Sequence, residues 1–238
     1  MKQAINIFTL LMLTIAVTGG PAVSGPSIYD DLLKTVNTDG DETSCTFSPD
    51  KSVFIFTRKT KNSSHYDLFI TEFSEGSWTI PESLTQINTD SDEISPFFSS
   101  DGKYLFFSSN RPESLKNKNA SKPSFDIYIS EREEEGWGVP LAVFGAINTS
   151  DDETNPSITP DGNMMYFTRT KFNDVKKSVI IQAERDEDIW GINMKNMDIS
   201  YITFLRIYMA KKSDNMPGFW VSAYEENQAS RDVFFIMV

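Results

Sequence analysis

Three segments of this chain align with one another without a gap, and this internal repeat constrains the fold more than any other feature of the sequence. Each segment begins with the pattern Asn-Thr-x-x-Asp-Glu, continues to a turn that contains Asp, and ends in a four-residue apolar run. The copies start at residues 37, 88 and 148, which are 51 and 60 residues apart. This spacing is near the length of a propeller blade and exceeds that of a leucine-rich or ankyrin repeat.

The repeat contains a hairpin whose second strand is deeply buried. The apolar run is hydrophobic at consecutive positions, as in Tyr104-Leu105-Phe106-Phe107, which predicts a strand buried on both faces. A tight turn joins it to the preceding strand. The second and third copies have Asp-Gly in this turn, a dipeptide that favours a short primed hairpin turn. We therefore expect Gly102 and Gly162 to have positive φ.

Two further strands follow the apolar run in each repeat. The third strand is expected at residues 67–70, 126–129 and 179–181. The fourth contains a tryptophan in every copy, and this recurrence indicates a packing role. These tryptophans are Trp78, Trp137 and Trp190. Pro81 and Pro140 then mark an exposed outer edge strand. The fold class predicted is all-β, a β-propeller built of four-stranded antiparallel blades.

Taken together, these elements resemble the TolB-like, WD-like β-propeller repeat of bacterial cell-envelope proteins. The second copy matches best, with Asn-Thr-x-x-Asp-Glu, the Asp-Gly turn, the aromatic apolar run, Asp-Ile-Tyr and Gly-Trp in order. The first copy has Lys51 in place of the turn glycine, and the third has Val179-Ile180-Ile181 in place of Asp-Ile-Tyr. The resemblance covers about residues 37–190. It implies a propeller that serves as a non-enzymatic binding scaffold in the cell envelope.

The repeats suggest a propeller domain of residues 25–238, with blades at about 37–87, 88–147 and 148–195. Residues 196–238 have three strand-like stretches but no Asn-Thr loop, which predicts a degenerate fourth blade. Two arrangements of the ends stay open. Residues 28–36 form an outer strand that completes the last blade and closes the ring, or the tail is a divergent cap on an open arc.

The first 24 residues have the pattern of a secretory signal peptide. Lys2 supplies a positive start, residues 5–17 are mostly apolar, and Ala22-Val23-Ser24 fits a cleavage site. The apolar run is too short for an ordinary membrane-spanning helix. We therefore expect an exported chain, located in the periplasm, at the outer membrane or outside the cell. We expect no stable membrane insertion of the mature chain.

Composition excludes several classes of function. The 238 residues include 34 acidic and 22 basic side chains, a formal net charge of −12, so a nucleic-acid partner is not expected. A single cysteine, Cys45, rules out a disulfide within the chain and a zinc site built of cysteines, and we expect it to be buried and inert. The only histidine, His65, lies in a polar loop and is interpreted as a surface residue.

Candidate catalytic and metal sites are not found. The acidic loops begin like a calcium loop, but the first of them, which starts at Asn37, has Glu42 at position six and Pro49 at position twelve, where an EF-hand needs Gly and Glu. Structural turns are the interpretation favoured for these loops. We see no phosphate-binding loop and no nucleophile elbow. The chain is therefore predicted to have no cofactor, no metal and no catalytic residues.

Basic residues gather in the loops between the second and third strands, on the side of the propeller that also carries the acidic Asn-Thr loops. We expect an envelope partner to dock on this loop-rich face. The candidate binding residues are Arg58, Arg111, Lys116, Lys118, Lys122 and Arg169. Arg58 and Arg169 are either rim charges or ligand contacts, and the alternative for the whole set is a solvated surface without a partner.

Three functions are compatible with this sequence. The first is an exported, non-enzymatic propeller that binds a protein, peptide or glycan of the cell envelope. The second is a glycan-active hydrolase or lyase on a propeller scaffold, because the chain has many carboxylates. The third is an incomplete propeller that functions only within a larger assembly. Fold alone does not decide among them.

Overall fold

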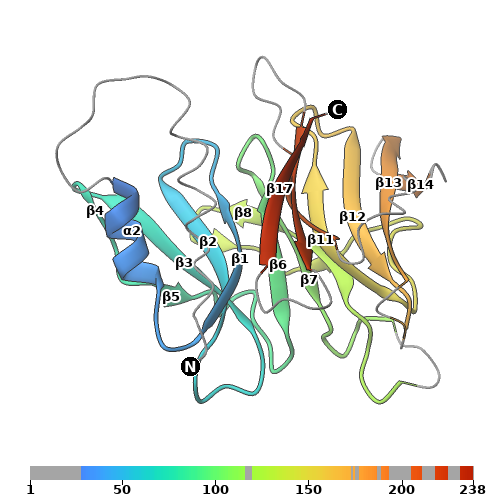
Figure 1. The fold of residues 1–238 in the computed structure, drawn as a ribbon, viewed down its shortest axis with the longest axis horizontal. Coiled ribbons are helices and arrows are strands. Elements are labelled where there is room, and N and C mark those ends of the chain that lie inside the picture. Colours follow the sequence, from blue (N-terminus) through green and yellow to red (C-terminus); the bar gives the residue numbers. More distant parts are fainter. Residues whose placement is uncertain are drawn as a thin grey trace.

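The computed structural model describes residues 28–115, 120–172, 174, 177–186, 189–192, 205–210, 218–224 and 231–237. These residues form antiparallel sheets that stand side by side (Figure 1). Blade 1 contains β1 (Asp41–Phe47), β2 (Val53–Lys59), β3 (Asp67–Ser74), β4 (Ser77–Trp78) and β5 (Glu82–Ser83). Blade 2 contains β6 (Glu93–Phe98), β7 (Tyr104–Ser109), β8 (Asp126–Glu133), β9 (Gly136–Trp137) and β10 (Leu141–Ala142). The predicted all-β, propeller-like architecture is confirmed.

The remaining strands form two further sheets. Blade 3 contains β11 (Asp152–Ile158), β12 (Met164–Thr170), β13 (Ser178–Asp186) and β14 (Ile189–Ile192). A three-stranded sheet contains β15 (Leu205–Ala210), β16 (Gly218–Tyr224) and β17 (Arg231–Met237). Each sheet runs outward from its first strand, in the order β1-β2-β3, β6-β7-β8 and β11-β12-β13. In blades 1 and 2 the outer strand is split into two short pieces, and Pro81 and Pro140 lie between the pieces, at the expected outer edge.

Neighbouring blades share their hydrophobic cores. Ile55 and Leu68 of blade 1 pack in one cluster with Phe107 of blade 2, while Phe106 of blade 2 packs in another with Phe167 of blade 3. Successive side chains of a strand point to opposite faces, so β7 contributes to both clusters. This geometry explains why the repeat is apolar at consecutive positions.

The first strands of the three blades line up at the inner side of the molecule, where β6 packs against both β1 and β11. Each of these strands has an irregularity in its pairing at the same point. There the Ser95 backbone N–H donates to Ser44 Oγ at 2.9 Å, and Ser95 Oγ donates to Asn155 Oδ1 at 3.0 Å. Polar side chains at these bulges therefore join one blade to the next.

The hairpin turns differ in detail from the expectation. Gly102 and Gly162 have φ of 72° and 73°, as predicted. However, the Gly102 N–H donates to the Ser99 carbonyl, and the Ser99 N–H donates to the Tyr104 carbonyl. The glycine is therefore the last residue of a β-turn within a four-residue loop, and not a central residue of a two-residue primed turn. Asp101 stabilises the longer loop by accepting hydrogen bonds from Ser99 Oγ and the Lys103 N–H.

Residues 28–36 form a helix, α2 (Ile28–Val36), so the prediction of an outer strand here was wrong. Leu32 and Val36 lie four residues apart and therefore share a helical face, which packs on Phe54 and Phe56 of blade 1. The segment has no strand to pair with among the described residues, and as a helix it buries the apolar side chains that share one face against the sheet. Figure 1 shows α2 lying against the face of blade 1 that is turned away from blade 2.

Helix α2 takes the place that an earlier blade would take. The Trp78 N–H of β4 donates to Asp31 Oδ2 of α2 at 3.2 Å. In blade 2, the equivalent Trp137 N–H donates to Gln86 Oε1 of blade 1 at 3.0 Å. Because α2 is helical, residues 28–36 do not close the ring as a strand.

The segment predicted to form a degenerate blade, residues 196–238, contains the sheet of β15, β16 and β17. Its pairing is antiparallel throughout, and β15 lies against β11 and β12 of blade 3. Closure of a ring through this sheet stays a prediction. Within the described ranges, no helix is long and apolar enough to span a bilayer.

Candidate binding site at the blade junctions

A glutamate–arginine pair, largely buried, recurs in blades 1, 2 and 3. The glutamate of the Asn-Thr-x-x-Asp-Glu pattern bonds an arginine that follows the apolar strand. The pairs are Glu42–Arg58 at 2.9 Å, Glu93–Arg111 at 3.4 Å and Glu153–Arg169 at 2.7 Å. Each arginine also donates through Nη2 to the backbone carbonyl that precedes the pattern, in Val36, Ile87 and Ile147 respectively. The pair therefore ties each blade to the segment before it.

In blade 2 the arginine of the pair stands at a different position in the sequence. Ser109 stands where blades 1 and 3 have arginine, and its Oγ donates to Glu93 Oε1 at 2.7 Å. Arg111, two residues later, folds back to the same carboxylate and packs over the rings of Phe107 and Tyr128. A signal for these pairs exists in the sequence, because Glu and Arg are 16 residues apart in two copies.

These contacts separate the candidate binding residues into three groups. Arg58 and Arg111 are buried and Arg169 is half-buried, and all three guanidinium groups are engaged inside the protein. Lys122 is exposed on the loop-rich face. Lys116 and Lys118 lie outside the described residues. The structure thus assigns the arginines to blade cohesion, a role the sequence analysis missed.

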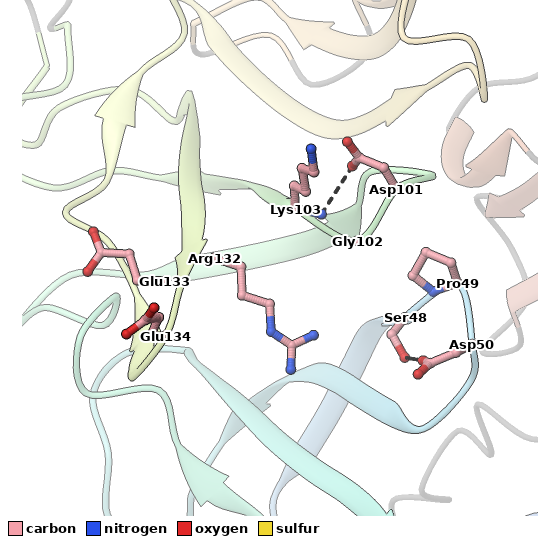
Figure 2. Close-up of a pocket in the computed structure, with 9 residues that line it drawn as sticks. All are labelled: Ser48, Pro49, Asp50, Asp101, Gly102, Lys103, Arg132, Glu133 and Glu134. Carbon is pink, nitrogen blue, oxygen red and sulfur yellow. Dashed lines mark hydrogen bonds between the residues drawn. The ribbon is translucent and has the colours of Figure 1, made fainter.

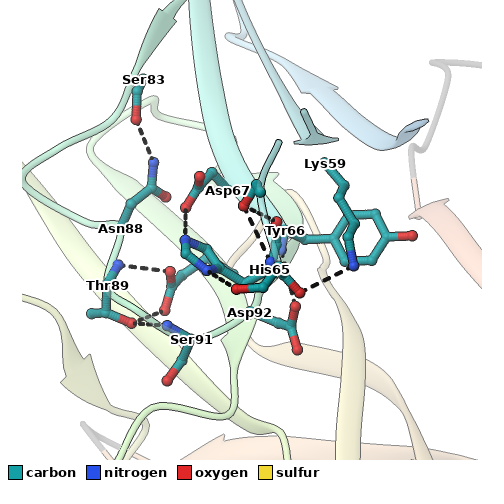
Figure 3. A network of polar contacts seen from close by, with 12 residues as sticks. Lys59, His65, Tyr66, Asp67, Ser83, Asn88, Thr89, Ser91 and Asp92 are labelled. Carbon is teal, nitrogen blue, oxygen red and sulfur yellow. Dashed lines mark hydrogen bonds and ion pairs between the residues drawn. The ribbon is translucent and has the colours of Figure 1, made fainter. Parts of the chain in front are cut away.

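The acidic loops bind the backbone of the preceding blade, as Figure 3 shows for the junction of blades 1 and 2. Asn88 accepts from the Leu68 N–H at 2.9 Å and donates to the Leu68 carbonyl at 2.8 Å. Asp92 accepts from the Tyr66 N–H at 2.9 Å. Asn148 and Asp152 repeat these contacts at the next junction. The structural interpretation of these loops is confirmed.

His65 lies in the same loop region and is half-buried. Its Nδ1 is 3.4 Å from Ser64 Oγ, and its Nε2 is 3.6 Å from Asp67 Oδ1. Both distances are longer than the about 2.6–3.2 Å at which a base typically activates a hydroxyl. Among the described residues, no group of three or more His, Cys, Asp or Glu side chains is arranged to hold a metal ion.

Asp126 is a buried carboxylate with a raised pKa at the junction of blades 2 and 3. Its residue is only 2% exposed, and burial raises its pKa to about 6. One oxygen, Oδ2, accepts from the Leu115 N–H at 2.8 Å, while Oδ1 has no hydrogen-bond partner among the described atoms. In blade 1 the equivalent Asp67 faces His65, but blade 2 has Ser124 at that position, so Asp126 lacks a cationic neighbour there.

The remaining sequence predictions concern packing residues. Trp78 and Trp137 are buried, at 7% and 6% exposure, which confirms their packing role; the side chain of Trp190 lies outside the described part. Cys45 is free and half-buried against the core of blade 1. Burial raises the pKa of its thiol to about 12, so the thiolate is disfavoured, as expected for an inert cysteine.

Two hollows lie between blades 1 and 2, on the side of the Asp-Gly turns. The first, of about 570 Å³, is bounded by the turn at Asp50, the turn at Asp101 and the end of β8. Figure 2 shows Arg132 extending into its middle, with Asp50 and Asp101 across from it. The Arg132 N–H donates to the Lys103 carbonyl at 2.7 Å, which fixes the strand end that carries this side chain.

The second hollow, which we call the junction groove, has a volume of about 460 Å³. It runs between residues 82–86 of blade 1 and residues 132–137 of blade 2, with Ile70 and Glu72 beside it. Gln86 bridges its two walls, since its Nε2 donates to the Glu135 carbonyl and its Oε1 accepts from the Trp137 N–H. The volume falls within the range of about 300–1,000 Å³ typical of ligand pockets.

No family model and no curated protein matches the chain, but solved structures are similar to it. A putative TolB from Agrobacterium tumefaciens is 15% identical over 66% of this chain and 50% of its own, with a TM-score of 0.47. TolB from Acinetobacter baumannii is 14% identical over 78% of this chain and 40% of its own, with a TM-score of 0.44. An alpha-L-arabinofuranosidase from Lactobacillus brevis is 12% identical over 78% of this chain and 68% of its own, with a TM-score of 0.51.

The chain spans half or less of the length of these two TolB structures. At such low identity, the likeness concerns the fold and leaves the ligand open. The three repeated blades, their shared cores and the recurring glutamate–arginine pairs are what define the architecture of this chain. Its fold is all-β and propeller-like, built of repeated antiparallel blades.

Proposed function

We propose that the chain is an exported, non-enzymatic β-propeller scaffold that binds a protein, peptide or glycan partner in the cell envelope. The observation that carries this proposal is the pair of hollows between blades 1 and 2, which lie on one side of the molecule. Binding sites are typically formed by loops and turns that a packed framework positions.

The side with the Asp-Gly turns is the better supported binding face. On the loop-rich side, Arg58, Arg111 and Arg169 are engaged in ion pairs with glutamates. The proposed docking there therefore rests on Lys116, Lys118 and Lys122. Charge reversals distinguish the two faces, because a reversal should weaken binding most when it lies on the face that contacts the partner.

A capture experiment with matched variants tests the proposal. The purified chain is immobilised and exposed to its own envelope fraction, and bound material is quantified by mass spectrometry. We expect Glu133→Lys with Glu134→Lys to remove a specific partner and Lys122→Glu to retain it. The reverse pattern would assign the partner to the loop-rich face. Retention of all partners by both variants, or release of sugar from an envelope glycan by the purified chain, would contradict the proposal.

A further inference from the structure

The walls of the junction groove carry an excess of negative charge. Five exposed carboxylates line it, against one basic side chain, that of Arg132. The carboxylates are Glu72, Glu82, Glu133, Glu134 and Glu135. None of the five forms an ion pair with a side chain in the described part of the chain. A hollow with walls of one sign of charge concentrates ligands of the opposite sign.

The groove also has apolar surface and an open strand edge. Its apolar lining is the half-buried side chain of Ile70, beside the buried Leu84 and Trp137. On the blade 1 side, β5 pairs with β3 alone among the described strands, at Ile70↔Glu82 and Phe69↔Ser83. Backbone groups on an outer strand are available to an added strand, which is a common way to bind an extended peptide.

From these features we infer that the junction groove binds an extended, basic polypeptide segment, in which lysine or arginine alternates with aliphatic residues. The cationic ends pair with the glutamates on the two walls, while the aliphatic residues and the stems of the long basic side chains cover Ile70. The backbone of the segment runs beside β5. This inference rests on the proposed binding function and specifies the chemistry of the partner.

A direct binding measurement tests the inference without knowledge of the natural partner. The probe is a fluorescent eight-residue peptide of alternating Lys and Val, with a Glu–Val peptide of equal length for comparison, and the readout is anisotropy with the purified chain. We expect the Lys–Val peptide alone to bind, with an affinity that falls as salt is raised.

Matched variants distinguish binding of the peptide in the groove from general electrostatic attraction to an acidic protein. Glu82→Gln with Glu133→Gln and Glu134→Gln should weaken binding roughly tenfold, as expected for the loss of three exposed ion pairs. The control removes three exposed carboxylates elsewhere, with Glu75→Gln, Asp90→Asn and Glu113→Gln, and should change affinity less than about twofold. Arg132→Gln should strengthen binding, because it removes the one basic side chain that lines the groove among the described residues. Thermal melts confirm that all variants are folded.

Several outcomes would overturn the inference. Equal weakening by the groove and control variants would show attraction by net charge alone. Equal binding of both peptides, or binding of neither, would exclude a basic segment as the ligand. The proposed function fails separately, since an envelope partner that is lost with Glu133→Lys and Glu134→Lys supports a binding scaffold even if the Lys–Val peptide does not bind.

Discussion

At the scale of single residues, burial decides the role of the charged side chains. Glu93 is fully buried and Arg111 is 6% exposed, so the pair is held almost entirely out of water. Removing one member of such a pair leaves an uncompensated charge, which costs more than the pair contributes. Arg58, Arg111 and Arg169 are therefore expected to be sensitive to substitution for structural reasons.

Arg111→Met should lower the free energy of unfolding by about 3–5 kcal/mol, because Glu93 is left buried without its cation. Adding Glu93→Gln to that variant should recover part of the loss. Urea unfolding followed by tryptophan fluorescence measures both changes. The exposed Arg132→Met is the control and should stay within about 0.5 kcal/mol of the unsubstituted chain. Equal effects of Arg111→Met and Arg132→Met would contradict the structural role of Arg111.

Asp126→Asn should stabilise the chain at neutral pH. The folded-state pKa of Asp126 is raised to about 6 from an ordinary 3.8, so its ionised form destabilises the fold above about pH 6. This penalty shrinks as pH falls from 6 towards 4 and is lost below about pH 3.8, where the carboxyl is protonated in both states. The asparagine keeps an oxygen for the Leu115 N–H. We expect a gain of up to about 3 kcal/mol at pH 7.5 and little gain at pH 4, measured by thermal melts; a gain independent of pH would point to another cause.

At the scale of turns and helices, the repeats provide internal comparisons. Lys51 occupies the position of Gly102 and Gly162 and has φ of 64°, a conformation that only glycine adopts readily. Lys51→Gly should therefore stabilise blade 1, and Gly102→Ala should destabilise blade 2, each by about 1 kcal/mol. Opposite signs in chemical unfolding are the expected result. A loss of stability for Lys51→Gly would show that the lysine side chain contributes more than the strained backbone costs.

Helix α2 should contribute substantially to stability through a few apolar contacts. Leu32 is fully buried, and Leu32→Ala should cost about 2–5 kcal/mol through lost burial and the cavity that remains. Lys34→Ala on the exposed face of the same helix should be nearly neutral. Differential scanning calorimetry of the two variants makes the comparison. Similar melting temperatures for both would mean that α2 is not docked on blade 1.

Much of the blade structure could be predicted from the sequence, because strands buried on two faces, such as Tyr104–Ser109, are apolar at consecutive positions. Helix α2 was mispredicted because only the spacing of Leu32 and Val36 distinguishes it from a strand in so short a segment. The roles of Arg58, Arg111 and Arg169 were missed because their burial depends on glutamates 16 to 18 residues earlier. The junction groove was not predicted, since it forms between turns that the sequence separates by about 50 residues.

At the scale of the whole molecule, export remains a prediction from the first 24 residues. If the chain is processed after the Ala22-Val23-Ser24 stretch, the protein recovered from its native envelope fraction should begin at about Gly25. Intact-mass measurement distinguishes this from a retained segment, which adds the mass of residues 1–24. Recovery of the unprocessed chain in the cytosol would contradict export. All contacts of α2 described above lie beyond this cleavage point, so processing should leave the fold intact.

The position of α2 has a consequence for how such a chain can grow or shrink. Arg58 bonds the carbonyl of Val36 at the end of the helix, just as Arg111 and Arg169 bond the carbonyls of Ile87 and Ile147 at the ends of blades. The end of a helix and the end of a blade thus offer the same backbone carbonyl acceptor to the arginine of the next blade. Duplicating residues 37–87 directly after Val36 would offer the new unit matching partners on both sides. Recombination between repeats could therefore add or remove a blade without changing the residues that form the contacts between blades.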